Sequence, residues 1–525
     1  MLRRVMRTLA VLALLAHLTC LAWLGRAERG GPPHLDLVVP GGIPATFYLP
    51  GPGAVSGFRF PDPPGAGNGP PAVLLVHGYS ADRAGMGMLA RRLASAGYGV
   101  LAIDVRGHGT NTRPFGRDPE DANLFEDLSA AADWLRASSW VDGTRLAVIG
   151  HSMGAGAALR FAERDVGVDA AVLISGGWVL LGPLRPPNAL FIYAERDPER
   201  IRNGAARIAA RLAGADGADG GEVGSFAGRD AVRAVEMPGN DHTTILWSKA
   251  AAREMIAWLD ASFAIEPTSE PDLAEPRAAP VLIAAALLPL TLAGLGLALG
   301  AVAPAWPRRE RRSWAALGGL AVALLAALPL ASAAPLAAFL ALDVADVLGG
   351  LFLSAGLLLC ALIALGGERL LPEPEDGAPS DTARGLLVGV AGFAALYALV
   401  APLGGLTHSL TPGPARAWAG VELAVLLLPF FLGFEHSVRR GGALGSLALG
   451  LAGRALTLAA LGLGIALGVL PPVVTLLFVP LALVLILGEV VGAAIHAGGG
   501  NRLASATLQA LFLAWVIASA MPLRG

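Results

Sequence analysis

At 525 residues the chain is too long for one ordinary domain, so its length predicts two or three folding units. Its formal net charge of −2 offers no electrostatic basis for binding nucleic acid. Both cysteines, Cys20 and Cys360, lie inside apolar runs, so neither a disulfide framework nor a metal site is indicated. Charged residues are interspersed up to about Phe263, whereas apolar runs dominate from Pro280 onward, as in a multi-span membrane region.

The N-terminal residues 1–27 combine a basic start with an apolar run from Thr8 to Leu24. This pattern fits either a cleaved signal peptide or a retained signal anchor. The apolar run is long for a signal peptide, and residues 25–28 make a poor cleavage site. We therefore favour the anchor, with the signal peptide as the alternative.

Residues 28–265 alternate between strand-like and helix-like segments, which predicts a mostly parallel α/β sheet. The first two strands are expected to form an antiparallel pair separated by residues 40–44. The expected strands are residues 34–39, 46–49, 72–76, 99–103, 146–149, 169–175, 189–193 and 232–236. The expected helices are residues 85–96, 123–138, the segment after residue 154, a segment from about residue 199, and residues 248–263.

The fifth of these strands runs directly into Gly150-His-Ser-Met-Gly154, which is followed by a helix-like run of small residues. Strand, sharp turn and helix in this order form the setting of a nucleophile elbow, with Ser152 at its apex. Glycines are needed at both ends of the motif because such a turn leaves no room for Cβ atoms there. The motif is weak by itself in a chain with 68 glycines, so its meaning depends on the residues around it.

Five landmarks together make residues 35–263 resemble the α/β-hydrolase superfamily, especially its serine esterase, dienelactone-hydrolase and monoglyceride-lipase-like branches. The resemblance covers about half the chain and implies an α/β-hydrolase domain in residues 28–265. The landmarks are, in chain order, His77-Gly78, Asp104-Val-Arg-Gly-His-Gly109, Gly150-His-Ser-Met-Gly154, Asp197 after a strand, and Asp241-His242 after the last strand.

The resemblance implies a catalytic triad in the family order of serine, acid and histidine, which Ser152, Asp197 and His242 satisfy. A serine hydroxyl is a weak nucleophile until a base takes its proton, and that base needs a third group to fix its tautomer. Glu195 is the nearest alternative to Asp197 as the acid.

The resemblance also supplies an oxyanion hole, because acyl transfer develops negative charge that two backbone N–H groups stabilise. The expected donors are the amides of Met153 and Tyr79. His108 and His151 precede the acid in the chain and are expected to have structural or supporting roles. No cofactor and no metal ion are implied.

Residues 266–280 are rich in proline and acid and are expected to form an extended linker. The remaining residues, 281–525, are expected to form an all-α membrane domain of about eight helices, or nine spans with the N-terminal anchor. The expected spans are residues 281–302, 314–333, 345–366, 385–403, 418–434, 443–470, 473–494 and 503–521.

Arginine placement predicts the orientation of these spans. With the N-terminus inside, twelve arginines fall on the cytoplasmic side (residues 3, 4, 7, 308, 309, 311, 312, 369, 384, 439, 440 and 502) and five outside (residues 26, 29, 277, 416 and 524). This asymmetry follows the positive-inside rule. We therefore expect an integral protein of a bacterial cell membrane, with its α/β-hydrolase domain on the extracytoplasmic side.

Ionisable residues in or near the spans raise the question of a transport pathway. Most of them lie near predicted span ends, where interfacial placement costs little. Only Arg454 and Glu489 look deep, and they could pair across two spans. The full set is Asp343, Asp346, Glu422, Glu435, His436, Arg454, Glu489 and His496.

The sequence therefore favours a membrane-anchored serine hydrolase that cleaves carboxylic esters, of a lipid or another acyl compound, through an acyl-enzyme. One alternative is an acyltransferase that uses the same triad. Another is a transporter or receptor whose hydrolase-like domain only binds a ligand, although a complete triad argues against it. Protein partners are not indicated.

Overall fold

The computed structural model describes residues 2–524 except 51–68, 117–121, 177–184, 215–220, 267–269, 304–312, 334–336, 369, 371–380, 407 and 441. The chain forms two compact units. The helical unit comprises Met1–Ala22, Ala279–Leu403 and Leu410–Met521. The sheet unit comprises Trp23–Ala278 together with two short segments, Gly404–Ser409 and Pro522–Gly525.

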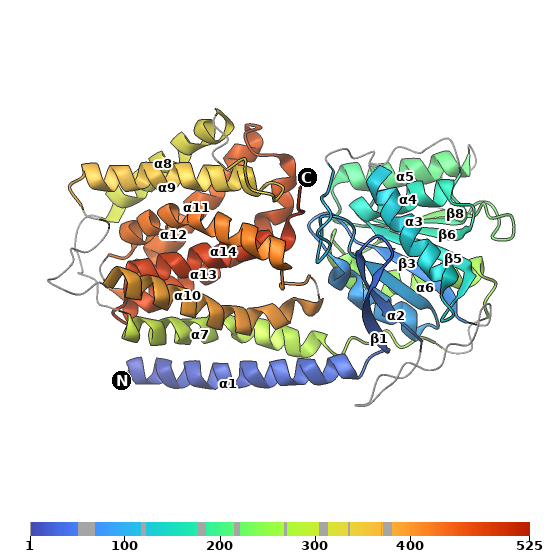
Figure 1. Cartoon of the computed structure of the whole chain (residues 1–525), viewed down its shortest axis with the longest axis horizontal. Helices are drawn as coiled ribbons and strands as arrows, with labels where there is room; N and C mark the ends of the chain where they lie inside the picture. Colours follow the sequence, from blue (N-terminus) through green and yellow to red (C-terminus); the bar gives the residue numbers. More distant parts are fainter. Residues whose placement is uncertain are drawn as a thin grey trace. The chain divides into compact units, whose positions relative to one another are not determined.

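The sheet unit is built on one eight-stranded sheet of order β1-β2-β4-β3-β5-β6-β7-β8 (Figure 1). β1 and β2 pair antiparallel, as do β2 and β4, and every other pair is parallel. The mostly parallel sheet predicted from the sequence is thus confirmed. In order from β1 to β8 the strands are His34–Val39, Ile43–Tyr48, Pro71–Val76, Gly99–Ile103, Asp142–His151, Val168–Ile174, Ala189–Ala194 and Val232–Met237.

The turn between β1 and β2 is shorter than predicted. We expected residues 40–44 to connect the strands, but β2 already begins at Ile43, which pairs with Val39. Pro44 lies within the strand, where its carbonyl oxygen accepts a hydrogen bond of 2.8 Å from the N–H of Asp104. A proline is tolerated here because this bond needs only its carbonyl group.

Helices cover both faces of the sheet (Figure 1). On one face pack α3 (Ala122–Ala137), α4 (Met153–Arg164) and α5 (Glu199–Ala213). On the other pack α2 (Gly87–Ser95) and α6 (Lys249–Ser262), which follow the short helices η1 (Arg83–Met86) and η2 (Thr244–Trp247). Every residue of β3 and β4 is buried, which explains why these strands are continuous apolar runs in the sequence.

The expected linker does not remain extended throughout. Leu273 is buried in the core beside α2 and α6. Arg277 is 4% exposed at its side chain, and it pairs with Glu275 at 2.7 Å and with Glu28 at 3.0 Å. A buried guanidinium requires such carboxylate partners, so this part of the linker is fixed by its own charges. Residues 267–269 lie outside the described part of the chain.

The described part of the helical unit contains α1, to Ala22, and eight further helices close to the predicted spans. The whole of α1 spans Leu2–Arg29. The other eight, in order from α7 to α14, span Ala278–Val302, Ser313–Ala333, Ala345–Leu365, Asp381–Val400, Pro414–Val438, Ala443–Ala466, Phe478–Ala497 and Arg502–Ala520. The short helix η3 (Ala401–Leu406) follows α10, and the short helix η4 (Pro472–Leu477) precedes α13. The long segment from Ala443, which contains Arg454, is one continuous helix.

Eight helices in the described residues, α1 included, are long and apolar enough to cross a membrane. We expected nine. The ninth position belongs to α8, whose apolar stretch Ala315–Ala331 is shorter than the others. Five of the arginines used for the orientation, at positions 308, 309, 311, 312 and 369, fall outside the described residues.

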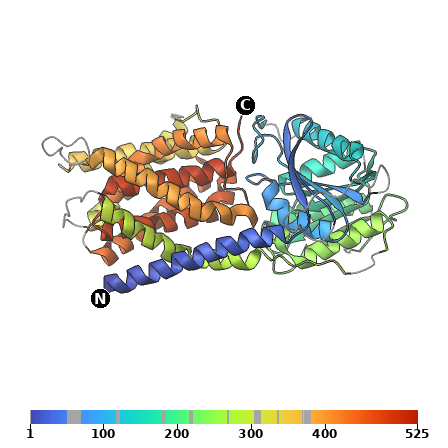
Figure 2. The same cartoon turned by 60° about the horizontal axis from the view of Figure 1, so that its bottom comes forward.

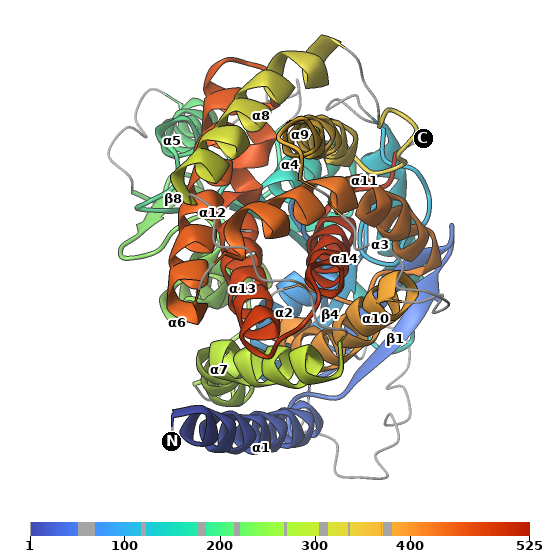
Figure 3. The same ribbon diagram turned by 90° about the vertical axis from the view of Figure 1, so that its left-hand side faces the viewer.

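Small residues allow the helices of this unit to approach closely. α1 lies beside α7 (Figure 2), where a Cβ atom added at Gly294 would come 2.6 Å from the Cβ of Ala10. α14 is enclosed by its neighbours when the unit is viewed along its helices (Figure 3), and most of its residues are buried.

Arg454 and Glu489 pair across α12 and α13, with 3.5 Å between Nε and Oε2, as the sequence suggested. The pair belongs to a larger buried cluster, because Arg439 contacts both Glu489 and, at 2.7 Å, Glu435. We placed Glu435 near a span end, but α11 continues to Val438 and Glu435 is fully buried. Two arginines and two glutamates balance each other's charge, which limits the cost of burying them. Gln509 adds a hydrogen bond of 2.9 Å to Glu435.

Candidate active site

Ser152 stands at a sharp turn between β5 and α4, with a left-handed φ of 56°. A Cβ atom added at Gly150 would overlap the carbonyl oxygen of Gly154, and one added at Gly154 would overlap the carbonyl oxygen of Val76. Both glycines are therefore sterically required, as expected for a nucleophile elbow. The N–H of Ser152 donates a 2.8 Å hydrogen bond to the carbonyl of Ile174, which ties the turn to β6.

The three residues named from the sequence as a triad lie together. His242 Nε2 is 3.1 Å from the Ser152 hydroxyl oxygen, and His242 Nδ1 is 2.6 Å from Asp197 Oδ1. Ser152 and Asp197 are buried, and the His242 side chain is 20% exposed. Each follows the carboxyl end of a parallel strand, namely β5, β7 and β8, so the sheet itself brings them to one edge.

Asp197 is held as a carboxylate. Its Oδ2 accepts hydrogen bonds from the Ser175 hydroxyl at 2.6 Å and from the N–H of Ala194 at 2.8 Å. Burial raises the pKa of Asp197, but these hydrogen bonds and the one from His242 outweigh it, so the pKa lies below its ordinary value. The alternative acid, Glu195, is directed elsewhere, because it accepts a 2.6 Å hydrogen bond from the N–H of Gly239.

The two expected oxyanion donors flank Ser152. Met153 is the first residue of α4, and the first four N–H groups of a helix have no partner within that helix. The backbone before Tyr79 passes directly over the serine, since a Cβ atom added at Gly78 would be 3.0 Å from the Ser152 Cβ. Glycine at position 78 thus permits the close approach that an oxyanion hole at Tyr79 requires.

Residues 70–212 match the family model described as serine aminopeptidase, S33. The matched stretch contains the elbow, β3 to β7 and Asp197, in the strand order described above. The sheet unit has the α/β-hydrolase fold. The name "hydrolase domain" is used for it below.

The chain is also similar to several individual proteins. An uncharacterized protein of Mycobacterium tuberculosis is 36% identical over 135 residues, which are 26% of this chain and 46% of that protein. Cutinase 2 of Thermobifida cellulosilytica is 36% identical over 107 residues, 19% of this chain and 37% of the cutinase. The chain thus spans less than half the length of these curated relatives. A hyperthermophilic esterase of the archaeon Pyrobaculum calidifontis is 19% identical with a TM-score of 0.33, covering 50% of this chain and 98% of the esterase.

His151, in the hydrolase domain, contacts the backbone of His242, one of the three residues predicted to form the triad. Its Nε2 contacts the carbonyl oxygen of His242 at 2.8 Å, and therefore carries the proton that it donates. Burial and the neighbouring His242 lower the pKa of His151 to about 3. His151 is consequently neutral in the folded state, and its supporting role stays a prediction.

This depressed pKa predicts a pH-dependent stability. Below pH about 6.5 the unfolded chain binds a proton at His151 that the folded chain excludes, so stability falls as the pH drops toward 3 by up to about 1.4 kcal/mol per pH unit. His151→Gln removes this proton difference. Its unfolding temperature in detergent should therefore fall less than that of the wild type between pH 6.5 and 4.5. Equal slopes for the two proteins would show that His151 does not titrate on unfolding.

Two further residues shape the site. Ser175 was not singled out from the sequence, and His77 was named there only as part of the His77-Gly78 landmark. Ser175, which directly follows β6, donates to Asp197, the predicted acid, and only its place after a buried strand pointed to it. His77 contacts the Gly78 carbonyl through Nδ1 at 2.8 Å and accepts the N–H of Val105 at Nε2 at 3.2 Å. Its pKa is lowered by burial, so a neutral ring links the loops after β3 and β4.

No group of three or more His, Cys, Asp or Glu residues in the described part of the chain is arranged to hold a metal ion.

Proposed function

We propose that the chain is a membrane-anchored serine hydrolase that cleaves carboxylic esters through an acyl-enzyme on Ser152. The observation that carries the proposal is the chain of contacts from the Ser152 hydroxyl through His242 to Asp197, at 3.1 and 2.6 Å, on a strained elbow. Nucleophile, base and orienting acid in this arrangement are the parts that acyl transfer by serine requires.

The reaction would begin when His242 Nε2 takes the proton of Ser152 as its oxygen attacks the acyl carbon. The oxygen of the tetrahedral intermediate would then accept hydrogen bonds from the N–H groups of Met153 and Tyr79. Asp197 would stabilise the imidazolium, which returns its proton to the departing alcohol. A water molecule activated by His242 would release the acid and restore the serine.

An ester is proposed as the scissile bond because the proteins similar to this chain include cutinases of Thermobifida cellulosilytica and Thermobifida fusca. The family model's description as a serine aminopeptidase makes an N-terminal peptide bond the second candidate. The same triad chemistry serves both bonds, so side-by-side assays with p-nitrophenyl esters and aminoacyl p-nitroanilides discriminate between them. We expect turnover of the esters. A lipid ester remains a candidate substrate beside other acyl esters.

The helical unit is proposed to span a membrane and to leave the hydrolase domain on the extracytoplasmic side. Support comes from eight long apolar helices and from the twelve arginines against five counted in the sequence. The substrate would then be met outside the cytoplasm or at the outer leaflet.

A single labelling experiment tests both parts of this proposal. A fluorophosphonate carrying a sulfonated, membrane-impermeant dye should label the full-length protein on intact spheroplasts, and Ser152→Ala should abolish the label. Equal labelling of the variant would contradict the role of Ser152. A label that appears only after lysis would place the hydrolase domain in the cytoplasm and leave the enzymatic proposal intact.

A further inference from the structure

Two short segments from far along the chain are part of the hydrolase domain. The insert segment, Gly404–Ser409, lies between α10 and α11, and the C-terminal segment, Pro522–Gly525, follows α14. The insert segment contacts the loop after β3 (residues 77–82, the β3 loop). The C-terminal segment contacts the loop after β4 (residues 104–116, the β4 loop). Both loops start at the sheet edge that holds Ser152.

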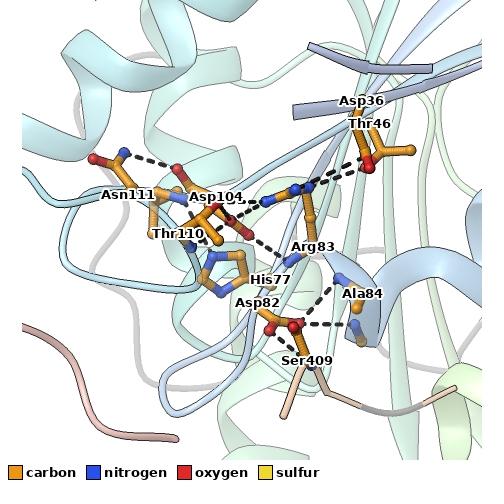
Figure 4. A network of polar contacts seen from close by, with 12 residues as sticks. Asp36, Thr46, His77, Asp82, Arg83, Ala84, Asp104, Thr110, Asn111 and Ser409 are labelled. Atoms are coloured by element: carbon orange, nitrogen blue, oxygen red, sulfur yellow. Dashed lines mark hydrogen bonds and ion pairs between the residues drawn. The ribbon is translucent and has the colours of Figure 1, made fainter. Parts of the chain in front are cut away.

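Asp82, at the end of the β3 loop, connects that loop to the insert segment (Figure 4). Its Oδ2 accepts a 2.8 Å hydrogen bond from the N–H of Ser409 and lies 3.5 Å from His408 Nδ1. Its Oδ1 accepts the N–H groups of Ala84 and Gly85 at 3.0 and 3.3 Å, at the start of η1. Asp82 is 1% exposed. A buried carboxylate needs partners for both oxygens, so Asp82 fixes its own helix and the insert segment together.

The charge on Asp82 is favoured by this setting. Burial raises its pKa, but the neighbouring His408 imidazole and the N–H groups of Ser409 and Gly85 outweigh burial and lower the pKa below its ordinary value. Hydrogen bonds to an ionised carboxylate are among the stronger ones in proteins. The hydrogen bond from the N–H of Ser409 to Asp82 is therefore expected to be strong.

The backbone of the C-terminal segment forms two hydrogen bonds with the backbone of the β4 loop. The N–H of Leu523 donates to the carbonyl of Gly107 at 2.8 Å, and the N–H of Phe115 donates to the carbonyl of Leu523 at 2.8 Å. The ring of Phe115 then meets Tyr79 edge-on, with 6.1 Å between the ring centroids, and His108 at 5.0 Å. The segment thus holds in place the aromatic ring that packs against Tyr79.

The β3 and β4 loops are also tied to each other. Arg83 forms an ion pair with the buried Asp104 (Figure 4), and His77 accepts the N–H of Val105 at 3.2 Å. Between these ties Ser80 adopts a left-handed φ of 58°, which is unfavourable for a residue with a Cβ atom. Such a conformation persists only where the surroundings impose it.

We propose that the insert and C-terminal segments are positioning elements of the active site, which hold the β3 loop so that the N–H of Tyr79 faces the oxyanion. This inference rests on the proposed function. The described residues of the two segments contact the β3 and β4 loops. Its consequence is that residues 28–265 supply the triad, whereas the oxyanion hole reaches its working geometry only with two segments that follow in the other half of the chain.

The test uses full-length Asp82→Asn and Ser409→Pro in detergent with a p-nitrophenyl ester. Asparagine keeps one oxygen for the start of η1 and turns an NH₂ group toward Ser409, while proline removes the N–H that Asp82 accepts. Each variant should lower kcat roughly 10- to 100-fold, because a misplaced donor weakens transition-state stabilisation. KM should stay within roughly three-fold of the wild type, since the oxyanion contact is absent in the ground state. Leu523→Pro should act in the same direction.

A double variant and two control variants distinguish a positioning role of the segments from a general loss of folding. The double variant Asp82→Asn/Ser409→Pro should be about as slow as either single variant, because both remove one link. Asp36→Asn changes another carboxylate near Arg83, which lies on β1 at 3.8 Å from Arg83 Nη2. Leu523→Ala keeps the backbone bonds of the C-terminal segment. Both controls should retain the wild-type kcat.

Two results would overturn the inference. One is a wild-type kcat in Asp82→Asn, Ser409→Pro and Leu523→Pro, whether or not their unfolding temperatures fall, because the segments would then serve stability alone. The other is strict additivity in the double variant. If wild-type hydrolysis does not depend on Ser152, the proposed function fails instead, and the two failures are thereby distinguished.

Discussion

Ser152→Ala and His242→Ala should each reduce kcat for short p-nitrophenyl esters by roughly 10⁴-fold or more. In the proposed mechanism Ser152 is the nucleophile, and His242 Nε2, which lies 3.1 Å from the Ser152 oxygen, is the base that takes its proton. The two residues act as one unit. The double variant should therefore be about as slow as either single variant rather than slower by the product of the two effects.

The measurement is initial rates with purified full-length protein, normalised to its amount. Ser262→Ala is the matched control, because the Ser262 hydroxyl donates a 2.8 Å hydrogen bond to the Trp258 carbonyl within its own helix, α6. It should keep the wild-type rate. Rates for Ser152→Ala close to that of the control would remove Ser152 from the mechanism and leave the elbow as a structural turn.

Much of the hydrolase domain was predictable because its signals are local. The strands His34–Val39 and Gly99–Ile103 have the predicted bounds, since an alternating edge strand and a buried apolar strand each leave a distinct pattern. The three residues predicted to form the triad follow such strands at their carboxyl ends. Once the strands are placed in a parallel sheet, the sheet edge alone brings Ser152, Asp197 and His242 near one another.

What the sequence did not reveal depends on contacts between distant residues. Asp82 and Ser409 are 327 positions apart, and nothing in the polar residues around Ser409 distinguishes a connecting loop from a segment of another unit. Glu435 was misplaced for a similar reason, because apolar composition ended one turn before the helix did. Its buried position depends on Arg439 and Gln509, whose partners only the packed helices define.

The acid of the triad was left with one alternative, and the contacts around Asp197 now predict how each variant behaves. Oδ2 of Asp197 faces the N–H of Ala194, a backbone donor that cannot be reversed, at 2.8 Å. In Asp197→Asn the single amide oxygen should take this position, which turns the NH₂ group toward His242 Nδ1. The imidazole must then accept at Nδ1 and carry its proton on Nε2, the atom that faces Ser152.

A histidine in that tautomer cannot take the serine proton, so Asp197→Asn should lower kcat by roughly 10⁴-fold with little change in KM. Glu195→Gln is the matched control, because a glutamine oxygen can still accept the N–H of Gly239 that Glu195 Oε2 accepts at 2.6 Å. It should stay within roughly three-fold of the wild type, as is usual for a residue outside the catalytic unit. Steady-state rates of both variants distinguish Asp197 from Glu195 as the acid. The opposite ranking would make Glu195 the acid and would require His242 to turn away from Asp197 in the working enzyme.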